Sequence, residues 1–398
     1  MTKLEKLLQE LCPEGVVYKT LGEIATDVFR GAGITRDQVR ETGTPCVRYG
    51  EIYTTYGVWF ENCVSHTDET LLTSKKYFGY GDILFAITGE SVEDIAKCCA
   101  YIGHETCLAG GDIVVLKHNE DPKYLSYALS TLDAQKQKSK GKVKSKVVHS
   151  SVPDIKAIRI PVPPLPVQRE IVRILDNFTE LTAELTAELT ARKKQYEFYR
   201  DKLLTFGDVR GGATSDVVWR TLGEICNISA GGDAPKDSMS KQKTEKHSVP
   251  IISNGIRENA LYGYTDAPKV EEPAVTVAAR GTIGYAEYRD YPFYPIIRLL
   301  TAIPKDTTVV NTKYLYYCLQ GKQYSVPMGG IPQLTAPELK KVEIPVPPLD
   351  VQTRLVSVLD NFDAICTDLS SGLPAEIEAR QKQYEYYRDK LLTFTPAD

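Results

Sequence analysis

The chain has 398 residues, of which 42% are hydrophobic and 25% are charged, and its formal net charge is −4. This composition is ordinary for a folded globular protein, and the length leaves room for a core in each of two domains. No stretch approaches the roughly 18 consecutive apolar residues of a membrane span, and the N-terminus lacks the apolar core of a signal peptide, so we expect a cytoplasmic protein.

The nine cysteines are scattered along the chain, apart from the adjacent pair Cys98 and Cys99, and none forms a C-x-x-C motif. Structural zinc sites need ligands paired at short spacing. We therefore expect no structural metal, and we expect reduced core thiols in a reducing compartment.

The first segment, residues 1–159, contains short β-branched and aromatic runs that glycines separate, such as 49–60 and 81–88. These runs predict strands joined by tight turns, while residues 124–137 have the pattern of a helix. The segment is therefore predicted to be an α+β domain.

A lysine-rich run from Lys136 to Lys146 carries six lysines in eleven residues and no acidic residue. If the run is extended it presents all six on one face, and if it is a loop it forms a flexible cationic strap. Either form suits a phosphate backbone, whereas the alternative is a solvated run without a partner.

A long helix is predicted in the next segment, residues 160–206. Neither Pro nor Gly occurs between Val167 and Phe206, and apolar residues recur at spacings of three and four. At 1.5 Å per residue this helix is about 57 Å long, too long for one small domain to bury. The stripe of apolar residues along this helix therefore needs a second helix to pack against.

The sequence TAEL occurs twice inside this helix, at 182–185 and 186–189, and a third copy begins at Thr190. One copy lengthens a helix by about 6 Å and rotates the part of the helix beyond it by about 40°. The repeat is interpreted as a ruler that sets a spacing, and the alternative is low-complexity helix filler.

After a linker at 207–216, the second half repeats the organisation of the first: a globular segment at 217–343, a helical segment at 344–394 and a tail at 395–398. In the globular segment, 273–288 predicts two strands about a Gly-rich turn and 312–320 predicts a short helix. The helical segment resembles 160–206 but is interrupted at 370–374. Two helices of like pattern are expected to bury their stripes as an antiparallel coiled coil.

Three blocks occur in both halves. The motif TLGEI stands at 20–24 and 221–225, IPVPPL at 160–165 and 344–349, and the segments 192–206 and 380–394 differ at two of fifteen positions. Everything between the first block and the second differs. One frame therefore holds two different domains, related by a pseudo-twofold repeat.

Catalytic motifs are absent from the sequence. It has no phosphate-binding P-loop, no amino-methyltransferase motif of the N-P-P-Y or D-P-P-Y type, and no H-E-x-x-H. The triplets 121–123 and 338–340 imitate a nuclease motif but arise readily by chance. We therefore expect a protein that is not an enzyme and whose catalytic partners are other chains.

With its duplicated TLGEI, IPVPPL, LDNF and QYEYYRDKLL-type blocks and its TAEL tandem, the chain resembles the specificity subunits of type I restriction-modification systems, within them the TAEL-repeat (type IC-like) subfamily. The resemblance implies two target recognition domains that read a split, asymmetric DNA site. It also implies two modification subunits that methylate adenine with S-adenosylmethionine, and restriction subunits that use ATP and Mg, with no cofactor in this chain. The alternative is a structural scaffold with two protein-binding domains on a coiled-coil rod.

Candidate DNA contacts are hydrogen-bond donors and aromatic residues in Gly-rich or basic loops, because Arg, Asn and Gln make bidentate contacts to base edges. They are Arg48, Tyr49, Lys142, Lys144, Lys146 and His149 in the first domain, and Asn254, Arg257, Arg280, Tyr285 and Gln333 in the second. Each candidate of the first domain has the alternative of an ordinary surface or core residue, and His149 also has that of capping a turn.

The repeated segment at the end of each helical region predicts docking positions for two like partners. The apolar and aromatic residues of its two copies are the candidates: Tyr196, Tyr199, Leu203, Tyr384, Tyr387 and Leu391.

Overall fold

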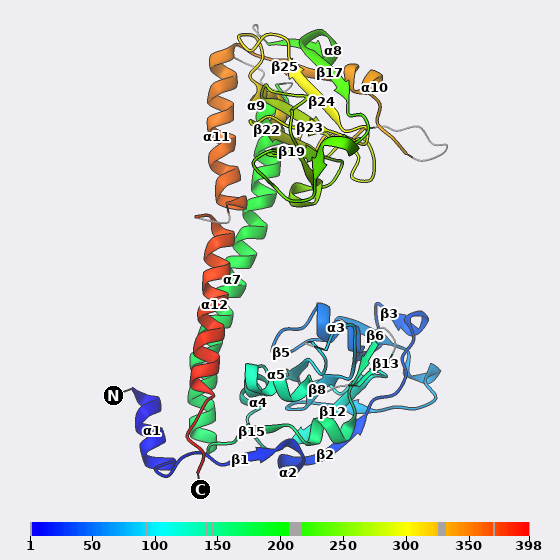
Figure 1. Ribbon diagram of the computed structural model, residues 1–398. Helices are drawn as coiled ribbons and strands as arrows, with labels where there is room; N and C mark the ends of the chain where they lie inside the picture. The colour runs from blue at the N-terminus through cyan, green and yellow to red at the C-terminus, as the bar shows by residue number, and fades with distance from the viewer. Residues whose placement is uncertain are drawn as a thin grey trace. The chain divides into compact units, whose positions relative to one another are not determined.

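The computed structural model describes residues 2–92, 94–139, 142–144, 147–206, 217–324, 332–368 and 371–397. The chain divides into two compact units, one formed by Met1–Thr186 with Ile377–Asp398 and the other by Ala187–Glu376. The boundary on the long helix falls inside the TAEL tandem. Figure 1 shows the elements of each unit.

Two five-stranded sheets form the N-terminal domain, with the orders β2-β12-β8-β10-β5 and β3-β6-β4-β11-β7, and a small sheet β13-β14-β9 lies beside them. The strands are β2 (Ala25–Arg30), β3 (Val39–Arg40), β4 (Thr44–Val47), β5 (Trp59–Phe60), β6 (Ser65–Thr67), β7 (Tyr77–Phe78), β8 (Ile83–Ala86), β9 (Thr88–Gly89), β10 (Cys98–Tyr101), β11 (Cys107–Ala109), β12 (Ile113–His118), β13 (Lys142–Lys144) and β14 (Val147–His149).

The central strand β8 explains where the core of this domain lies. Ile83 and Phe85 belong to one buried cluster, while Leu84 and Ala86 belong to another. Because successive side chains of a strand point to opposite faces, β8 is buried on both sides and reads as a continuous apolar run.

The helices of the N-terminal domain differ in two places from the sequence predictions. Residues 49–54 form a helix, not a strand, because the Glu51 carboxylate accepts a hydrogen bond from the Arg48 backbone and closes a cap at its start. The single helix predicted at 124–137 is two helices, and Thr131 caps the second. The helices are α1 (Lys3–Leu11), α2 (Leu21–Ile24), α3 (Tyr49–Thr54), α4 (Pro122–Leu129), α5 (Leu132–Lys138) and α6 (Val152–Lys156).

The C-terminal domain has two four-stranded sheets, β17-β24-β21-β22 and β18-β20-β19-β23. The order of the first sheet matches β2-β12-β8-β10 of the other domain. The elements are β17 (Cys226–Ala230), β18 (Met239–Ser240), β19 (Val249–Ile252), β20 (Leu261–Thr265), β21 (Ala274–Val277), β22 (Ala286–Arg289), β23 (Tyr294–Pro295), β24 (Leu300–Pro304), α8 (Leu222–Ile225), α9 (Thr312–Leu319) and α10 (Ala336–Lys340).

In both domains, the strand that leads into the repeated TLGEI block pairs with the strand that begins the repeated IPVPPL block. Strand β1 (Tyr18–Thr20) is antiparallel to β15 (Arg159–Pro161), and β16 (Val218–Thr221) is antiparallel to β25 (Glu343–Val346). Thus the two sequence blocks that open and close each domain meet as a two-stranded sheet.

The long helix α7 (Leu165–Leu204) contributes to both units. In the first unit it packs against α12 (Leu373–Leu391), where Phe178 and Tyr387 stack with ring centroids 5.5 Å apart. In the second unit it packs against α11 (Leu349–Thr367), where the rings of Tyr199 and Phe362 are 6.3 Å apart. Each pair is antiparallel (Figure 1). The predicted pairing of helices is confirmed, and so is the predicted interruption between α11 and α12.

A buried glutamine joins the first domain to its helix. Gln168 is fully buried, and its side-chain oxygen accepts a hydrogen bond from the Asp121 backbone at 3.0 Å. Its amide nitrogen donates to a Glu120 carboxylate oxygen and to the Pro163 carbonyl, both at 2.7 Å. The amide thus satisfies polar groups that burial would otherwise leave unpaired.

Gln352 does the same in the second domain. It accepts from the Asn311 backbone at 2.9 Å and donates to the carbonyls of Val309 and Pro347 at 2.8 Å. The glutamine after each Pro-rich block is therefore a structural joint.

An aspartate about two turns further along each helix fixes the adjacent short helix. Lys123 and Lys313 donate to Asp176 and Asp360, each at 2.8 Å. Tyr127 and Tyr317 donate to the same two carboxylates.

No described helix is long and apolar enough to cross a membrane.

Candidate nucleic-acid interface

The turn between β21 and β22 presents Arg280 at the surface of the C-terminal domain. Backbone hydrogen bonds close it, from Ala278 to the Tyr285 carbonyl and from Gly284 to the Ala278 carbonyl, each at 2.9 Å. Gly281 has φ +69°, and a Cβ built on it would meet no atom within 4 Å. Glycine is therefore required here by the backbone conformation, and the outer side of the turn is open to a ligand.

Asn254 holds this turn in place. Its side-chain oxygen accepts a hydrogen bond from the Ala279 backbone at 2.8 Å, its amide nitrogen donates to the Ile297 carbonyl, and its own carbonyl accepts from Thr282 at 2.8 Å. The nitrogen and the oxygen of the amide each hold one hydrogen bond within the domain, so Asn254 positions the turn, and its contact with a base stays a prediction.

Arg280 and Gln333, two separate candidates in the sequence, form a pair. The Gln333 side-chain oxygen accepts from Arg280 Nε at 3.0 Å and from Arg280 Nη2 at 2.6 Å. Among the described residues, Arg280 has no carboxylate at ion-pair distance, so its charge is not neutralised by a neighbouring acid.

Arg257 and Tyr285 line cavities of the same domain. Arg257 is exposed and lies at the edge of a cavity of about 710 Å³ and of a second of about 810 Å³, which Tyr285 also lines. Burial raises the pKa of Tyr285, so its phenol stays protonated and able to donate.

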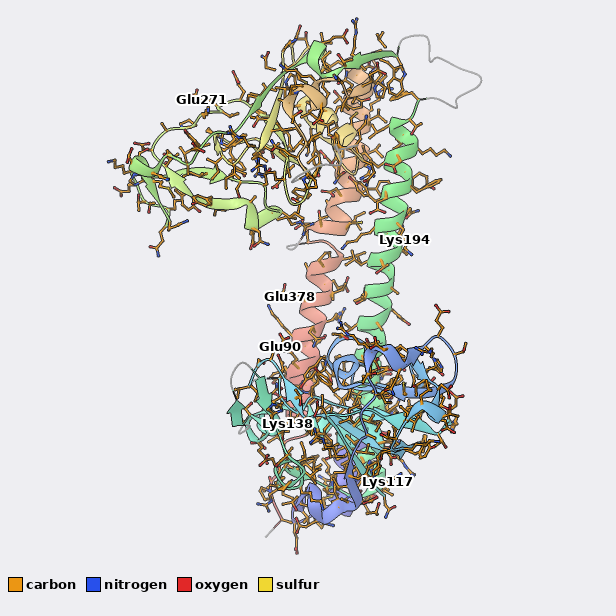
Figure 2. The ribbon with its side chains drawn as sticks, turned by 90° about the vertical axis from the view of Figure 1, so that its right-hand side faces the viewer. Glu90, Lys117, Lys138, Lys194, Glu271 and Glu378 are labelled. Atoms are coloured by element: carbon orange, nitrogen blue, oxygen red, sulfur yellow. The ribbon has the colours of Figure 1, made fainter. Side chains whose placement is uncertain are left out.

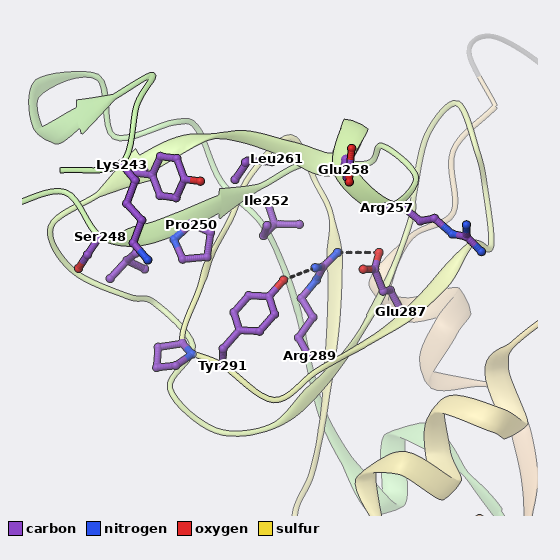
Figure 3. Close-up of a pocket in the computed structure, with 13 residues that line it drawn as sticks. Lys243, Ser248, Pro250, Ile252, Arg257, Glu258, Leu261, Glu287, Arg289 and Tyr291 are labelled. Atoms are coloured by element: carbon purple, nitrogen blue, oxygen red, sulfur yellow. Dashed lines mark hydrogen bonds and ion pairs between the residues drawn. The ribbon is translucent and has the colours of Figure 1, made fainter. Parts of the chain in front are cut away.

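Figure 3 shows the first of these cavities. The basic side chains that line this cavity differ in their exposure. Arg289 is 4% exposed and already donates to Thr276, Tyr291 and Glu287 at 3.1, 2.6 and 3.0 Å. Lys243, by contrast, is exposed at the edge. Lys243 was missed in the sequence, although the lysines at 241, 243 and 246 are a signal of the kind used for the first domain.

In the N-terminal domain, Arg48 and Tyr49 line a cavity of about 540 Å³ together with Arg36 and Asp112. Arg48 is ion-paired with Glu51 at 3.2 Å, while Tyr49 is exposed. The structure brings these two predicted residues together at the start of α3. Their contact with DNA stays a prediction.

The lysine-rich run does not form one uniform cationic face. Its first part belongs to α5, where Lys138 is buried and donates to the Leu129 carbonyl at 2.7 Å. Figure 2 labels Lys138 in the N-terminal domain. Lys136 and Lys138 lie on a helix, which turns them to different directions, so the extended form considered for the run does not hold for its first part. Lys142 and Lys144 lie on β13, and Lys146 lies outside the described residues.

His149 does not cap a turn but lies on β14, where it is exposed. Its Nδ1 lies 3.2 Å from the Thr88 hydroxyl, on the neighbouring strand β9. Thr88 was missed in the sequence. The signal that could have found it is its position next to Gly89, at the end of a buried strand.

The predicted docking residues fall into two groups. Tyr196 and Tyr384 are only 7% and 6% exposed, and Tyr196 donates to Gln320 at 2.6 Å within its own unit. Their assignment to a partner surface is therefore wrong, because their rings are out of a partner's reach. Leu203 and Leu391 are partly buried in the same apolar clusters.

The exposed members of each copy are Tyr199 and Tyr387 together with two neighbours that sequence reasoning missed. Phe198 and Tyr386 are 60% and 61% exposed. The ammonium groups of Lys202 and Lys390 lie 5.9 and 5.8 Å from their ring centroids. Neither helical copy alone signals this, because the exposed face depends on which side packs inward.

Within the described residues, no group of three or more His, Cys, Asp or Glu side chains could hold a metal ion. The geometry thus offers turns with hydrogen-bond donors, cavities lined by cations and aromatic rings, and two matching surface patches on helices. Such a set is suited to contact with a macromolecule.

A family model for the type I restriction modification DNA specificity domain matches residues 13–192 and 214–379. The chain belongs to this family. A putative type I specificity subunit of Mycoplasma pneumoniae is 36% identical over 299 residues, covering 71% of this chain and 85% of that protein. The EcoR124I/EcoR124II specificity subunit of Escherichia coli is 34% identical over 300 residues, covering 68% and 70%.

Solved structures agree on the fold of this specificity subunit. The S subunit of a type I restriction-modification system from M. genitalium is 16% identical, with a TM-score of 0.53 and 99% of both chains covered. A chain from a structure of the type I R-M system is 19% identical, with a TM-score of 0.64 and 96% and 98% covered. The predicted α+β class with two similar domains on long helices is thus confirmed.

Family membership also decides between the two functions predicted from the sequence. This specificity subunit is a non-catalytic DNA-recognition protein of a type I restriction-modification system, and the scaffold alternative is set aside.

Proposed function

We propose that the chain reads a split, asymmetric DNA sequence, with one half-site assigned to residues 1–159 and the other to residues 217–343. One observation carries this proposal: the two domains share the strand order of one sheet but present different side chains from it. Two identical domains would select a palindrome, whereas two unlike domains in one chain select unlike half-sites.

In this proposal the helical regions 160–206 and 344–394 hold the domains and dock two modification subunits, while 207–216 and 395–398 are a linker and a tail. The patches around Phe198 and Tyr386 support two like partners, because their sequences and exposures match although the adjoining domains differ. Those subunits would methylate adenine with S-adenosylmethionine. Restriction subunits using ATP and Mg would complete the complex, which acts on DNA in the cytoplasm.

The basic residues contribute affinity in this proposal. Lys142, Lys144 and Lys146 would contact phosphates, which position the protein without selecting sequence. Arg48, Tyr49, Arg257 and Tyr285 would extend the contact from their cavities.

The TAEL tandem would set the spacing of the half-sites, as expected for the TAEL-repeat subfamily. One further copy inserted after Leu189 adds about 6 Å to the helix, on the scale of one or two base-pair steps. Neither domain is altered. We therefore expect both half-sites to keep their bases and the spacer to lengthen, by one base pair if tilt absorbs part of the rise.

Methylome sequencing of cells that express this chain with its modification subunit tests the proposal. The expected result is a split motif with two different half-sites, and a longer spacer when the insertion is present. A palindromic motif would refute the assignment of unlike half-sites. Changed half-site bases with an unchanged spacer would return the tandem to helix filler.

A further inference from the structure

The segments that carry Thr88 and Arg280 occupy the same place in the two domains. In β12, Leu116 lies opposite Val28 on one side and Ile83 on the other. In β24, Ala302 lies opposite Ile228 and Val275 in the same way. Ala25 and Cys226, the residues directly after each TLGEI block, lie opposite His118 and Pro304, and Leu116 and Ala302 stand two residues before these. Ile83 and Val275 are therefore equivalent.

Counting forward from these two positions brings the chain to two equivalent segments, although their local backbones differ: Thr88 and Gly89 form strand β9, whereas Gly281 lies in a turn with φ +69°. Thr88-Gly89 begins five residues after Ile83, and Arg280-Gly281 begins five residues after Val275. Both dipeptides thus follow equivalent buried strands.

The backbone hydrogen-bond partners of the two segments are equivalent as well. The Ser150 backbone donates to the Ile87 carbonyl at 3.0 Å, and the Leu334 backbone donates to the Ala279 carbonyl at 2.9 Å. The next residues, Ser151 and Thr335, are the N-caps of α6 and α10. Since His149 precedes Ser150 and Gln333 precedes Leu334, His149 and Gln333 also correspond.

Each domain therefore carries one cross-loop pair of polar side chains at this place: Thr88 with His149, 3.2 Å apart, and Arg280 with Gln333, 2.6 and 3.0 Å apart. The two pairs share their position in the domain but not the chemistry of their side chains. This is the pattern expected of residues that select different bases on a common frame.

The Arg280–Gln333 pair offers only donors. Two of the five guanidinium N–H groups are spent on the Gln333 oxygen, which is the only acceptor of the pair. Three guanidinium N–H groups and the two of the Gln333 amide remain. A free glutamine recognises adenine by donating and accepting together, and this one can no longer accept.

We propose that these two pairs are equivalent base-reading positions and that Arg280, held by Gln333, selects a guanine in the half-site of the C-terminal domain. The guanine edge in the major groove presents two acceptors, O6 and N7, whereas adenine places a donor beside its N7. The inference rests on the proposed split-site function and names one base of it.

A DNA phosphate also accepts hydrogen bonds, so the experiment must separate a phosphate contact from a guanine contact. The complex of the full chain with its modification subunit is used to select duplexes from a library with randomised sequence. Wild type is compared with Arg280→Lys, which keeps the charge but loses the planar fork, and with Gln333→Leu, which removes the partner.

The expected result is that both variants lose preference at the same guanine by roughly 5- to 150-fold, while the remaining positions of the motif stay unchanged. Thr88→Val should alter one position of the other half-site only. Each half-site thus controls for folding of the other. Replacing the guanine by 7-deazaguanine should weaken wild type and leave Arg280→Lys unaffected.

Two outcomes overturn the inference. Equal weakening on all duplexes with an unaltered motif would make Arg280 a phosphate contact, and loss of preference at a base pair other than G·C would refute guanine. If wild type itself shows no split motif, the proposed function fails and not only this assignment.

Discussion

At the joint between domain and helix, the N-terminal and C-terminal halves place the same side chains at matching positions. Gln168 and Gln352 are both fully buried and each makes three hydrogen bonds, and Asp176 and Asp360 each accept from a lysine and a tyrosine. The segments that follow each central strand lie at equivalent positions but carry different side chains. The buried joint thus keeps its central side chains in both halves, whereas the exposed segments do not.

The joints also contain a few differences. Gln168 donates to the Glu120 carboxylate where Gln352 donates to the Val309 carbonyl. Thr179 lies three residues after Asp176, and Asp363 lies three residues after Asp360. These side-chain differences can be used to test whether the two joints contribute equally to stability.

The largest effect is expected from removing the buried amides. Gln168→Ala and Gln352→Ala should each lower the free energy of unfolding by about 3 kcal/mol, because several buried partners lose their hydrogen bonds. Gln168→Ala should cost more, because it also breaks a charge-assisted bond. Denaturant unfolding of the full chain measures both, with the exposed Gln381→Ala as a control. A change below about 1 kcal/mol for either glutamine would break the comparison.

A smaller effect is expected at the two helical patches. Phe198→Ala and Tyr386→Ala should each weaken binding of one modification subunit by about 2 kcal/mol, because large exposed aromatic residues dominate protein interfaces. The double variant should bind neither subunit, as mass measurement of the complex would reveal. Phe198→Tyr, which makes the first copy match the second at this position, should change nothing. Unaltered assembly of the double variant would place the docking surface elsewhere.

The smallest effect is expected at Asp363. Burial raises the pKa of its carboxyl, with Asp360 adding to the effect and Thr367, Arg257 and Lys313 opposing it. The folded state therefore binds the proton more tightly than the unfolded state, so stability is lost as pH rises through the raised pKa. Asp363→Asn should remove this loss and stabilise the chain at neutral pH by less than about 1 kcal/mol.

Unfolding measured across a pH series checks this expectation. Thr179→Ser serves as the matched change in the other half, where no ionisable group stands at this position, and it should leave the pH dependence as it is. A stability of Asp363→Asn that still falls with rising pH as in wild type would contradict the assignment.

Much of the architecture follows from local sequence. The uninterrupted run from Val167 to Phe206 predicts α7 because no residue in it breaks a helix. The break before Pro374 predicts separate helices α11 and α12 for the converse reason. By contrast, 49–54 has the composition of a strand and forms a helix, because the cap at Arg48 and Glu51 outweighs weak β propensity.

The candidate site was predicted by residue type but not by role. Asn254 carries the chemistry of a base reader, yet its amide also bonds the Ala279 and Ile297 backbones, 25 and 43 positions away in the chain, and so holds a turn in place. Tyr196 and Tyr199 have the same type and lie one helical turn apart, yet packing buries the first and exposes the second. Neither outcome is visible from composition.

By itself the sequence determined the duplication, the long helix, the α+β class and the family, because repeated motifs and helical periodicity are properties of neighbouring residues. Only the tertiary structure decided that Gln333 lies against Arg280, that His149 lies against Thr88 and that these pairs are equivalent. Each pair joins residues more than 50 positions apart. The pairing of β9 with β14 brings the first together, and the backbone bond from Leu334 to Ala279 the second. Local sequence gives no signal of a contact between residues so far apart, because the contact depends on how the whole sheet between them folds.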